Sequence, residues 1–347
     1  MNKDFLLKLL NTSSPSGMEK EVQLLWLDYM KNYSHKTETD NVGNAYAILN
    51  PDADFKVMIA AHGDEIGFMI KRIDDKGFIY LEKLGGISPK IAIGMKIKIM
   101  GKKEITGIVG ANAEHHGGVK EKLTIDDIYI DCGFRNKEEA IEFLNIGDMA
   151  VYVRTAQLLQ NNRISSKALD NKSGSFIIAE VMKNLIDKNL NIGVYAVNTS
   201  TEETNQGGAY FAGSRIAPNL AIICDVTFAT DYPSVNQSKH GEYSLDKGPV
   251  LAKGAPINSK INLLLEKSAK ELDINLQYEL TPGRTGTDAD TIKYTGKGVP
   301  IALVSLPIRY MHSPVETASF NDIQNEIDLL TNFILNLKPS TNLNPLS

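Results

Sequence analysis

GVYAVNTSTEE, residues 193–203, is an apolar segment that ends in two adjacent carboxylates, Glu202 and Glu203. Its apolar part predicts a strand that is buried on both faces in the centre of a sheet. Two neighbouring carboxylates at a strand end can divide the work of a metal-dependent hydrolase, because one can bind metal while the other transfers protons. The segment therefore predicts a central strand and one part of a metal-dependent catalytic site.

The same pattern, a polar side chain at the end of an apolar run, recurs at four other places. His62 and Asp64 follow the apolar run 57–61, Asp225 follows 220–224, His312 comes shortly after 299–304, and Asp170 precedes an amphipathic helix. Ligands of open α/β sheets collect outside the carboxyl ends of the strands. We therefore expect these scattered side chains to converge on one site.

Helix and strand patterns alternate over residues 1–66 and 164–338, which predicts an α/β domain with a mixed sheet flanked by helices. Helices are expected at about 18–33, 173–190, 257–272 and 320–337. Residues 67–163 instead contain short alternating segments separated by Gly and charged turns, which is typical of a small antiparallel sheet or barrel. We expect an α/β domain interrupted by this β-rich insertion and followed by a polar, disordered tail, residues 339–347.

The charge, cysteine content and hydropathy of the chain indicate which partners and which cellular compartment to expect. The chain has 347 residues, 42% of them apolar, and a formal net charge of −5, which gives no reason to expect nucleic acid or an anionic membrane as a partner. Its two cysteines, Cys132 and Cys224, are too few for a disulfide framework. No apolar run approaches the roughly 20 residues that a transmembrane helix needs. We expect a soluble, cytoplasmic protein.

The residues at the strand ends supply a complete set for a hydrolytic site with two metal ions. His62, Asp170 and Asp225 are predicted to hold one ion, and Asp170, Glu203 and His312 the other. Glu202 is then the general base, and its side chain points away from that of Glu203 if both residues lie in extended backbone. Asp64 is predicted to accept the imidazole N–H of His62 and so to fix the tautomer that binds metal.

Each of these residues also has a simpler explanation when it is taken alone. Asp170 could cap the helix that follows it, and Glu202 and Glu203 could be a solvated pair. The joint pattern favours the metal site, because all of these positions fall at the ends of apolar segments. His115 and His116 lie in the inserted region before two glycines. They are expected in a surface loop, which in an oligomer could border the active site of a neighbour.

Several strings of the sequence together resemble a known family. These are AHGDEIGF at 61–68, ALDN at 168–171, TEE at 201–203 with GA at 208–209, DVT at 225–227, GTDA at 286–289 and RYMHSPVE at 309–316. They are similar to the co-catalytic metal aminopeptidases that include glutamyl and deblocking aminopeptidases and the tetrahedral peptidases. Some relatives carry a cellulase label, but this chain has no pair of glycosidase carboxylates with sugar-stacking aromatics. One departure from the family pattern is Asn171-Lys172, which stands where an Asp-Arg step is frequent.

The resemblance implies a catalytic domain interrupted by a β-rich dimerisation domain, and a homo-oligomer that can be a hollow twelve-subunit tetrahedron. It implies peptide substrates that lose their N-terminal residue with Glu202 as the base. The two ions are expected to be Zn²⁺ or Co²⁺, with Mn²⁺ also possible. Asp288 is either a turn residue or part of the pocket that holds the substrate amine. Arg284 and Lys239 are candidates to pair with an acidic first side chain of the substrate.

Two rival functions remain open from the sequence. A carboxypeptidase or deacylase of the same superfamily must bind a substrate carboxylate, for which Arg284 or Arg309 could serve. A non-catalytic metal-binding scaffold could keep the same fold, but Glu202 argues against it, because a protein without activity has no use for a buried base beside two metals.

Overall fold

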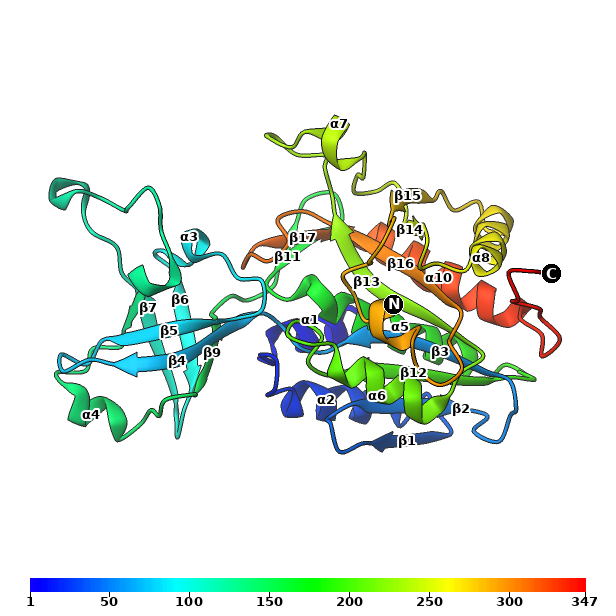
Figure 1. The fold of residues 1–347 in the computed structure, drawn as a ribbon, viewed down its shortest axis with the longest axis horizontal. Coiled ribbons are helices and arrows are strands. Elements are labelled where there is room, and N and C mark those ends of the chain that lie inside the picture. Colours follow the sequence, from blue (N-terminus) through cyan, green and yellow to red (C-terminus); the bar gives the residue numbers. More distant parts are fainter.

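The structure is a computed structural model that describes residues 1–347, and it contains two lobes (Figure 1). One lobe is an α/β domain built on a mixed sheet, and the other is a closed β-barrel. The barrel is inserted in the chain between strands of the α/β domain. The predicted fold class, an α/β domain interrupted by a β-rich barrel, is therefore confirmed.

The main sheet has eight strands in the order β1-β2-β12-β3-β13-β16-β14-β15. Their bounds are β1 (Lys36–Thr39), β2 (Ala45–Leu49), β3 (Lys56–His62), β12 (Gly193–Thr199), β13 (Leu220–Phe228), β14 (Val250–Lys253), β15 (Gln277–Leu280) and β16 (Ile301–Ile308). The four central strands β12, β3, β13 and β16 are parallel to one another. β2 and β14 flank them and run antiparallel to β12 and β16. The carboxyl ends of the central strands therefore share one edge of the sheet.

Helices cover both faces of this sheet, because its inner strands are buried on both sides. One face carries α1 (Lys3–Asn11), α2 (Lys20–Met30), α5 (Leu169–Leu185), α8 (Ser259–Glu271) and α10 (Phe320–Asn336), and the other carries α6 (Gly207–Ile216) and α9 (Ala289–Ile292). Along β2, Ala45, Ala47 and Leu49 join the first core, and Tyr46 and Ile48 join the second. This division of alternate residues between two cores is what a central strand requires. The short helix α7 (Gln237–His240) lies between β13 and β14.

A second, small antiparallel sheet contacts α5. Its strands are β10 (Gln157–Leu159), β11 (Arg163–Ser166) and β17 (Glu316–Ser319), in the order β10-β11-β17. Ser166 pairs with Glu316 in this sheet. The chain reaches Asp170 shortly after β11 and passes His312 shortly before β17. The pairing of these two strands therefore brings the start of α5 close to the loop that carries His312.

The barrel closes six antiparallel strands in the order β4-β5-β8-β7-β6-β9. They are β4 (Gly67–Ile73), β5 (Ile79–Leu84), β6 (Lys96–Met100), β7 (Glu104–Val109), β8 (Tyr129–Asp131) and β9 (Met149–Tyr152), and four short helical turns connect them, α3 (Pro89–Ala92), η1 (Glu114–His116), η2 (Ile125–Asp127) and α4 (Lys137–Ile141). Phe68, Ile97 and Ile130 are among the 16 buried residues of its own core. Closure pairs every strand on both sides, which leaves no free strand edge.

The C-terminal tail differs from its predicted disorder. Leu343 is buried in the main core, and its carbonyl oxygen accepts a hydrogen bond of 2.9 Å from Asn258 Nδ2. The burial of Leu343, this hydrogen bond and the hydrogen bonds from Lys260 Nζ to Ser347 hold the tail against the start of α8. No helix of the structure combines the length and apolar character that crossing a membrane requires.

Candidate active site

The parallel central strands carry four of the predicted metal ligands to one edge of the main sheet. β3 ends at His62, β12 is followed by Glu203, β13 contains Asp225, and β16 leads to His312. The fifth predicted ligand, Asp170, comes from the first turn of α5, before the regular part of that helix begins. The five side chains lie together, as the strand pattern predicts. They line one side of a cavity of about 670 Å³.

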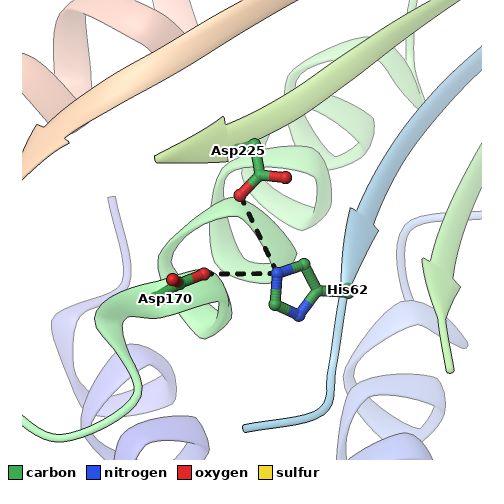
Figure 2. A group of neighbouring side chains, drawn as sticks. All are labelled: His62, Asp170 and Asp225. Carbon is green, nitrogen blue, oxygen red and sulfur yellow. Dashed lines mark ion pairs between the residues drawn. The ribbon is translucent and has the colours of Figure 1, made fainter. Parts of the chain in front are cut away.

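His62, Asp170 and Asp225 form the first group of side chains that could hold a metal ion (Figure 2). His62 Nε2 lies 3.2 Å from Asp170 Oδ1 and 3.8 Å from Asp225 Oδ1. All three residues are buried. One imidazole nitrogen and two carboxylate oxygens that face each other in this way are suitable donors for a divalent transition metal.

Asp170, Glu203 and His312 form the second such group. His312 Nε2 lies 3.3 Å from Asp170 Oδ2 and 3.8 Å from Glu203 Oε2. Asp170 therefore directs Oδ1 towards His62 and Oδ2 towards His312. A carboxylate that presents one oxygen to each of two donor groups has the arrangement of a bridging ligand.

The charge of this cluster also fits bound cations. Burial raises the pKa of Glu203 well above its usual range, and the charge of Asp170 adds to this rise. Burial likewise raises the pKa of Asp225, with further contributions from Asp170 and Glu202. Glu203 Oε1 is buried and has no hydrogen-bond partner. Divalent cations would neutralise these crowded carboxylates and give the unpartnered oxygen a ligand, so the residues fit two metal ions.

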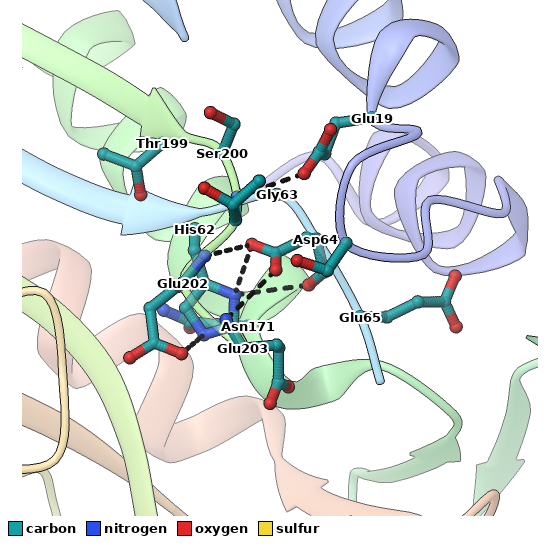
Figure 3. Close-up of polar contacts among 12 residues, drawn as sticks. Glu19, His62, Gly63, Asp64, Glu65, Asn171, Thr199, Ser200, Glu202 and Glu203 are labelled. Carbon is teal, nitrogen blue, oxygen red and sulfur yellow. Dashed lines mark hydrogen bonds and ion pairs between the residues drawn. The ribbon is translucent and has the colours of Figure 1, made fainter. Parts of the chain in front are cut away.

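The carboxylate of Asp64 contacts two parts of this candidate metal centre, the ring of His62 and the turn that carries Glu202 and Glu203 (Figure 3). Its Oδ1 lies 3.4 Å from His62 Nδ1, on the side of the ring opposite the metal-facing nitrogen. The carboxylate also accepts hydrogen bonds from the backbone N–H groups of Glu202, at 3.0 Å, and Glu203, at 3.1 Å. His62 Nδ1 also lies 3.2 Å from the backbone carbonyl oxygen of Asp64, so the main chain and the carboxylate both face this ring nitrogen. The role of Asp64 as its acceptor stays a prediction, and the two contacts with the turn were not predicted.

Glu202 and Glu203 lie in a turn and not in extended backbone. β12 ends at Thr199, and Thr201 has a positive φ of 57°. Glu19, at the start of α2, accepts a hydrogen bond of 3.0 Å from the N–H of Thr201 and holds the turn from its other side (Figure 3). The separation of the two glutamates therefore comes from the turn and its carboxylate partners, and not from the alternation of a strand.

Glu202 lies beside both groups of candidate ligands but belongs to neither. Its Oε2 is 3.7 Å from His62 Nε2, and its Oε1 accepts a hydrogen bond of 3.2 Å from Gln206 Nε2. Burial raises the pKa of its carboxyl group above the usual value. A buried carboxylate that borders the metal ligands and faces the cavity is placed to exchange a proton with a water there.

Glu316 was not predicted as a site residue, although it connects two candidate ligands. It is buried, and it accepts hydrogen bonds from the backbone N–H of Asp170, at 3.1 Å, and of His312, at 2.8 Å. The sequence feature that could have identified Glu316 as a site residue is its position four residues after His312, at the start of β17. Only the pairing of β17 with β11 shows that its carboxylate also reaches Asp170.

The structure does not bring the predicted substrate-binding residues together in the cavity. Arg284 lines the cavity, but its side chain is 79% exposed and its Nε donates to Asp290 at 3.2 Å. Lys239 lies on α7 and is not among the residues that line the cavity. Asp288 is buried behind the cavity lining, where Oδ2 accepts a hydrogen bond of 2.5 Å from Thr199 Oγ1. His115 and His116 are exposed in η1 of the barrel lobe.

Comparison with known proteins agrees with this geometry. The profile of the M42 glutamyl aminopeptidase family matches residues 43–329 of the chain. A putative aminopeptidase of Acetivibrio thermocellus is 36% identical, over 95% of this chain and 98% of its own length. The lysyl aminopeptidase of Pyrococcus furiosus is 33% identical, over 97% of each chain. The TET1 peptidase of Pyrococcus horikoshii has a similar structure, with a TM-score of 0.86 and 26% identity over 96% of this chain and 99% of that one. The chain therefore belongs to the M42 glutamyl aminopeptidase family, and it is an aminopeptidase.

Proposed function

We propose that this aminopeptidase uses two divalent metal ions and that Glu202 is its general base. The observation that supports the proposal most is the sharing of Asp170 by two groups of donor atoms. His62 and Asp225 complete the first group, and Glu203 and His312 complete the second. Glu202 borders both groups without belonging to either, which leaves its carboxylate free for proton transfer.

The donor set favours Zn²⁺ or Co²⁺, and Mn²⁺ is a further candidate, because mixed imidazole and carboxylate ligands accept all three. When bound, such ions polarise the scissile carbonyl group and lower the pKa of the attacking water. Glu202 takes the proton of that water and passes it to the leaving amine. Asp64 orients both His62 and the turn that carries Glu202. The free α-amino group of the peptide binds near the metal ions, among the acidic side chains of the cavity.

We also propose that residues 67–163 act as a dimerisation domain and that the chain forms a homo-oligomer, with a twelve-subunit tetrahedron as the candidate assembly. The TET1 peptidase of Pyrococcus horikoshii, which resembles this chain, can assemble into a tetrahedron or a large octahedral shell. The barrel supports the proposal because it has its own core and projects from the α/β domain (Figure 1).

A carboxypeptidase needs a cation that is free to bind the substrate carboxylate. Neither arginine that could serve is free. Arg309 donates to Asp231 through Nε, at 2.8 Å, and Nη2, at 2.7 Å, and it does not line the cavity. Arg284 is already paired with Asp290. An excess of carboxylates in the cavity favours a substrate with a free amine over one with a free carboxylate.

Metal analysis combined with a panel of peptides tests this function. The purified protein should bind about two ions per chain and should cleave peptides with a free N-terminus. N-terminal acetylation should abolish cleavage, whereas C-terminal amidation should leave it unchanged. Cleavage of acetylated peptides with loss on amidation would instead support a carboxypeptidase, and metal binding without any cleavage would support a scaffold.

A further inference from the structure

One carboxylate of the cavity has no part in the proposed metal centre. Glu279 lies on β15, the edge strand of the main sheet next to β14. Its neighbours in the strand, Tyr278 and Leu280, are exposed, while Glu279 is partly buried and lines the cavity. Alternation along the strand therefore turns this one acidic side chain inward.

The carboxylate of Glu279 is held by two hydroxyl groups from other strands. Oε2 accepts a hydrogen bond of 2.6 Å from Thr227 Oγ1 on β13, and Oε1 accepts one of 3.1 Å from Ser305 Oγ on β16. The side chain therefore reaches from the edge strand towards the centre of the sheet, and both of its oxygens have fixed positions. A carboxylate with two short polar contacts is preorganised and not a mobile surface charge.

These contacts place the carboxylate close to the metal centre. Thr227 follows Asp225 by two residues in the same strand, so both side chains are on one face of the sheet. Ser305 pairs directly with Asp225 in the parallel register of β13 and β16. Glu279, Thr227 and Asp225 all line the same cavity. A substrate whose scissile bond lies at the metal centre can therefore extend its first side chain towards Glu279.

Glu279 lacks a counter-ion within the protein. No Lys, Arg or His nitrogen lies within 4.0 Å of its carboxylate, and Arg284, the remaining cation of the cavity, is paired with Asp290. Burial raises the pKa of Glu279, because the two hydroxyl groups offset the loss of water only in part. A carboxylate in such a position gains more from an incoming cation than an exposed carboxylate does.

We propose that Glu279 determines specificity and selects peptides whose first residue is cationic, lysine or arginine. This inference rests on the proposed function, since it assigns a substrate class to the same cavity. The ammonium or guanidinium group of the substrate pairs with Glu279, and the aliphatic part of its side chain packs on apolar cavity residues such as Met311 and Leu303. Pairing of an acidic substrate with Arg284 is the less favourable arrangement, because Arg284 is exposed and already shared with Asp290.

The test compares lysine with norleucine, which has a similar aliphatic chain and no charge. Initial rates on Lys-, norleucine- and Glu-anilides give kcat/KM for the native enzyme and for Glu279→Gln, which keeps the size of the side chain. Its amide can accept a hydrogen bond from one hydroxyl group and donate one to the other, because both hydroxyl groups can rotate. We expect the native enzyme to prefer Lys over norleucine, and Glu279→Gln to lower this ratio by about 30-fold or more, the usual effect of losing a buried charge partner. The rate on norleucine should stay within about threefold of the native rate.

Two control variants show whether a change in rate is specific to Glu279. Glu104→Gln, an exposed ion-pair partner of Lys98 on the barrel, should leave all three rates unchanged. Arg284→Ala should not reduce the Lys rate. Equal loss on Lys and norleucine in Glu279→Gln would show a structural role and overturn the proposal, as would a native preference for Glu. Failure of the metal-loaded native enzyme on every substrate with a free N-terminus would instead overturn the proposed function itself.

Discussion

The carboxylate of Asp64 accepts a hydrogen bond of 3.0 Å from the backbone N–H of Glu202. The same carboxylate lies 3.4 Å from Nδ1 of His62. One side chain therefore connects a candidate metal ligand with the proposed base, and it does so from behind the centre, where it is buried. Because it touches the ring and the turn at once, its loss should affect proton transfer as well as metal affinity.

Asp64→Asn should lower kcat by about 10–100-fold, the usual effect of losing a partner behind a metal ligand. An amide has one acceptor oxygen, and its NH2 group would face the second N–H group of the turn, so Glu202 loses its fixed position. The backbone carbonyl oxygen of this residue, which lies 3.2 Å from His62 Nδ1, is unchanged. Saturating metal should restore occupancy but only part of the rate, which titration with metal followed by rate measurement will show. Full recovery of the rate at high metal would mean that Asp64 acts through metal affinity alone.

Glu202→Gln should lower turnover by about 10²–10⁴-fold, because it removes the proton acceptor and keeps the shape of the side chain. Metal content should remain at the native level, since Glu202 belongs to neither donor group. Elemental analysis and kcat on one peptide substrate, measured on the same preparation, check both statements. A variant that has lost its metal, or one that retains near-native turnover, would exclude Glu202 as the base.

Asp170→Asn should reduce metal content more than substitution of any other single ligand. Asp170 presents one oxygen to each donor group, at 3.2 Å from His62 and 3.3 Å from His312, whereas each other ligand serves one group. His62→Ala and His312→Ala are the matched comparisons, and each should retain close to one ion per chain. Two bound ions in purified Asp170→Asn would contradict the bridging assignment.

The sequence was sufficient to predict the edge of the sheet at which the site lies. Parallel strands buried on both faces must end at one edge, so the side chains that follow the apolar runs, such as His62 and Asp225, had to meet there. This argument needs only strand direction and burial, and both are encoded locally. The inserted barrel was equally recognisable, because its short alternating segments differ from the longer apolar strands.

The remaining contacts depend on tertiary pairings that no local pattern encodes. Glu316 reaches Asp170 only because β17 pairs with β11. Glu279 lies in a four-residue edge strand, and its hydroxyl partners come from β13 and β16. Lys239 was a candidate for the cavity because its loop follows Asp225, but that loop leads away from the cavity to α7. Loop direction and strand order, and not residue type, account for these differences.

Glu65→Gln should destabilise the fold by about 3–5 kcal/mol at neutral pH, because it removes the charge partner of two buried lysines. Glu65 Oε1 lies 2.9 Å from Lys172 Nζ, and its Oε2 lies 2.5 Å from Lys167 Nζ. Denaturant unfolding gives the difference in free energy. Glu82→Gln, which removes an exposed ion pair with Lys71, is the control and should cost less than about 1 kcal/mol.

The effect of Glu65→Gln should also depend on pH. Burial alone would raise the pKa of Glu65, but Lys167 and Lys172 lower it from 4.5 to about 2 in the folded state. The stabilisation is therefore complete above the unfolded pKa and is lost as pH falls from about 4.5 towards 2. The free energies of unfolding of the native chain and the variant should approach each other over that interval. A difference that stays constant from pH 7 to pH 3 would show that charge is not its cause.

Replacing the barrel with a short flexible linker should reduce the size of the assembly. Removal of residues 67–154 takes out the six barrel strands and leaves β10, which pairs with β11 beside the start of α5. The α/β domain has its own large core, and the five proposed metal ligands all lie outside the removed segment, so a cooperative unfolding transition and bound metal should persist. Activity should fall, because the segment includes Gly86, which lines the cavity beside His312. Light scattering on the native chain and the shortened chain gives the subunit number of each. If the shortened chain retains metal and forms the same assembly as the native chain, the subunit contacts belong to the α/β domain and the barrel is not the dimerisation domain.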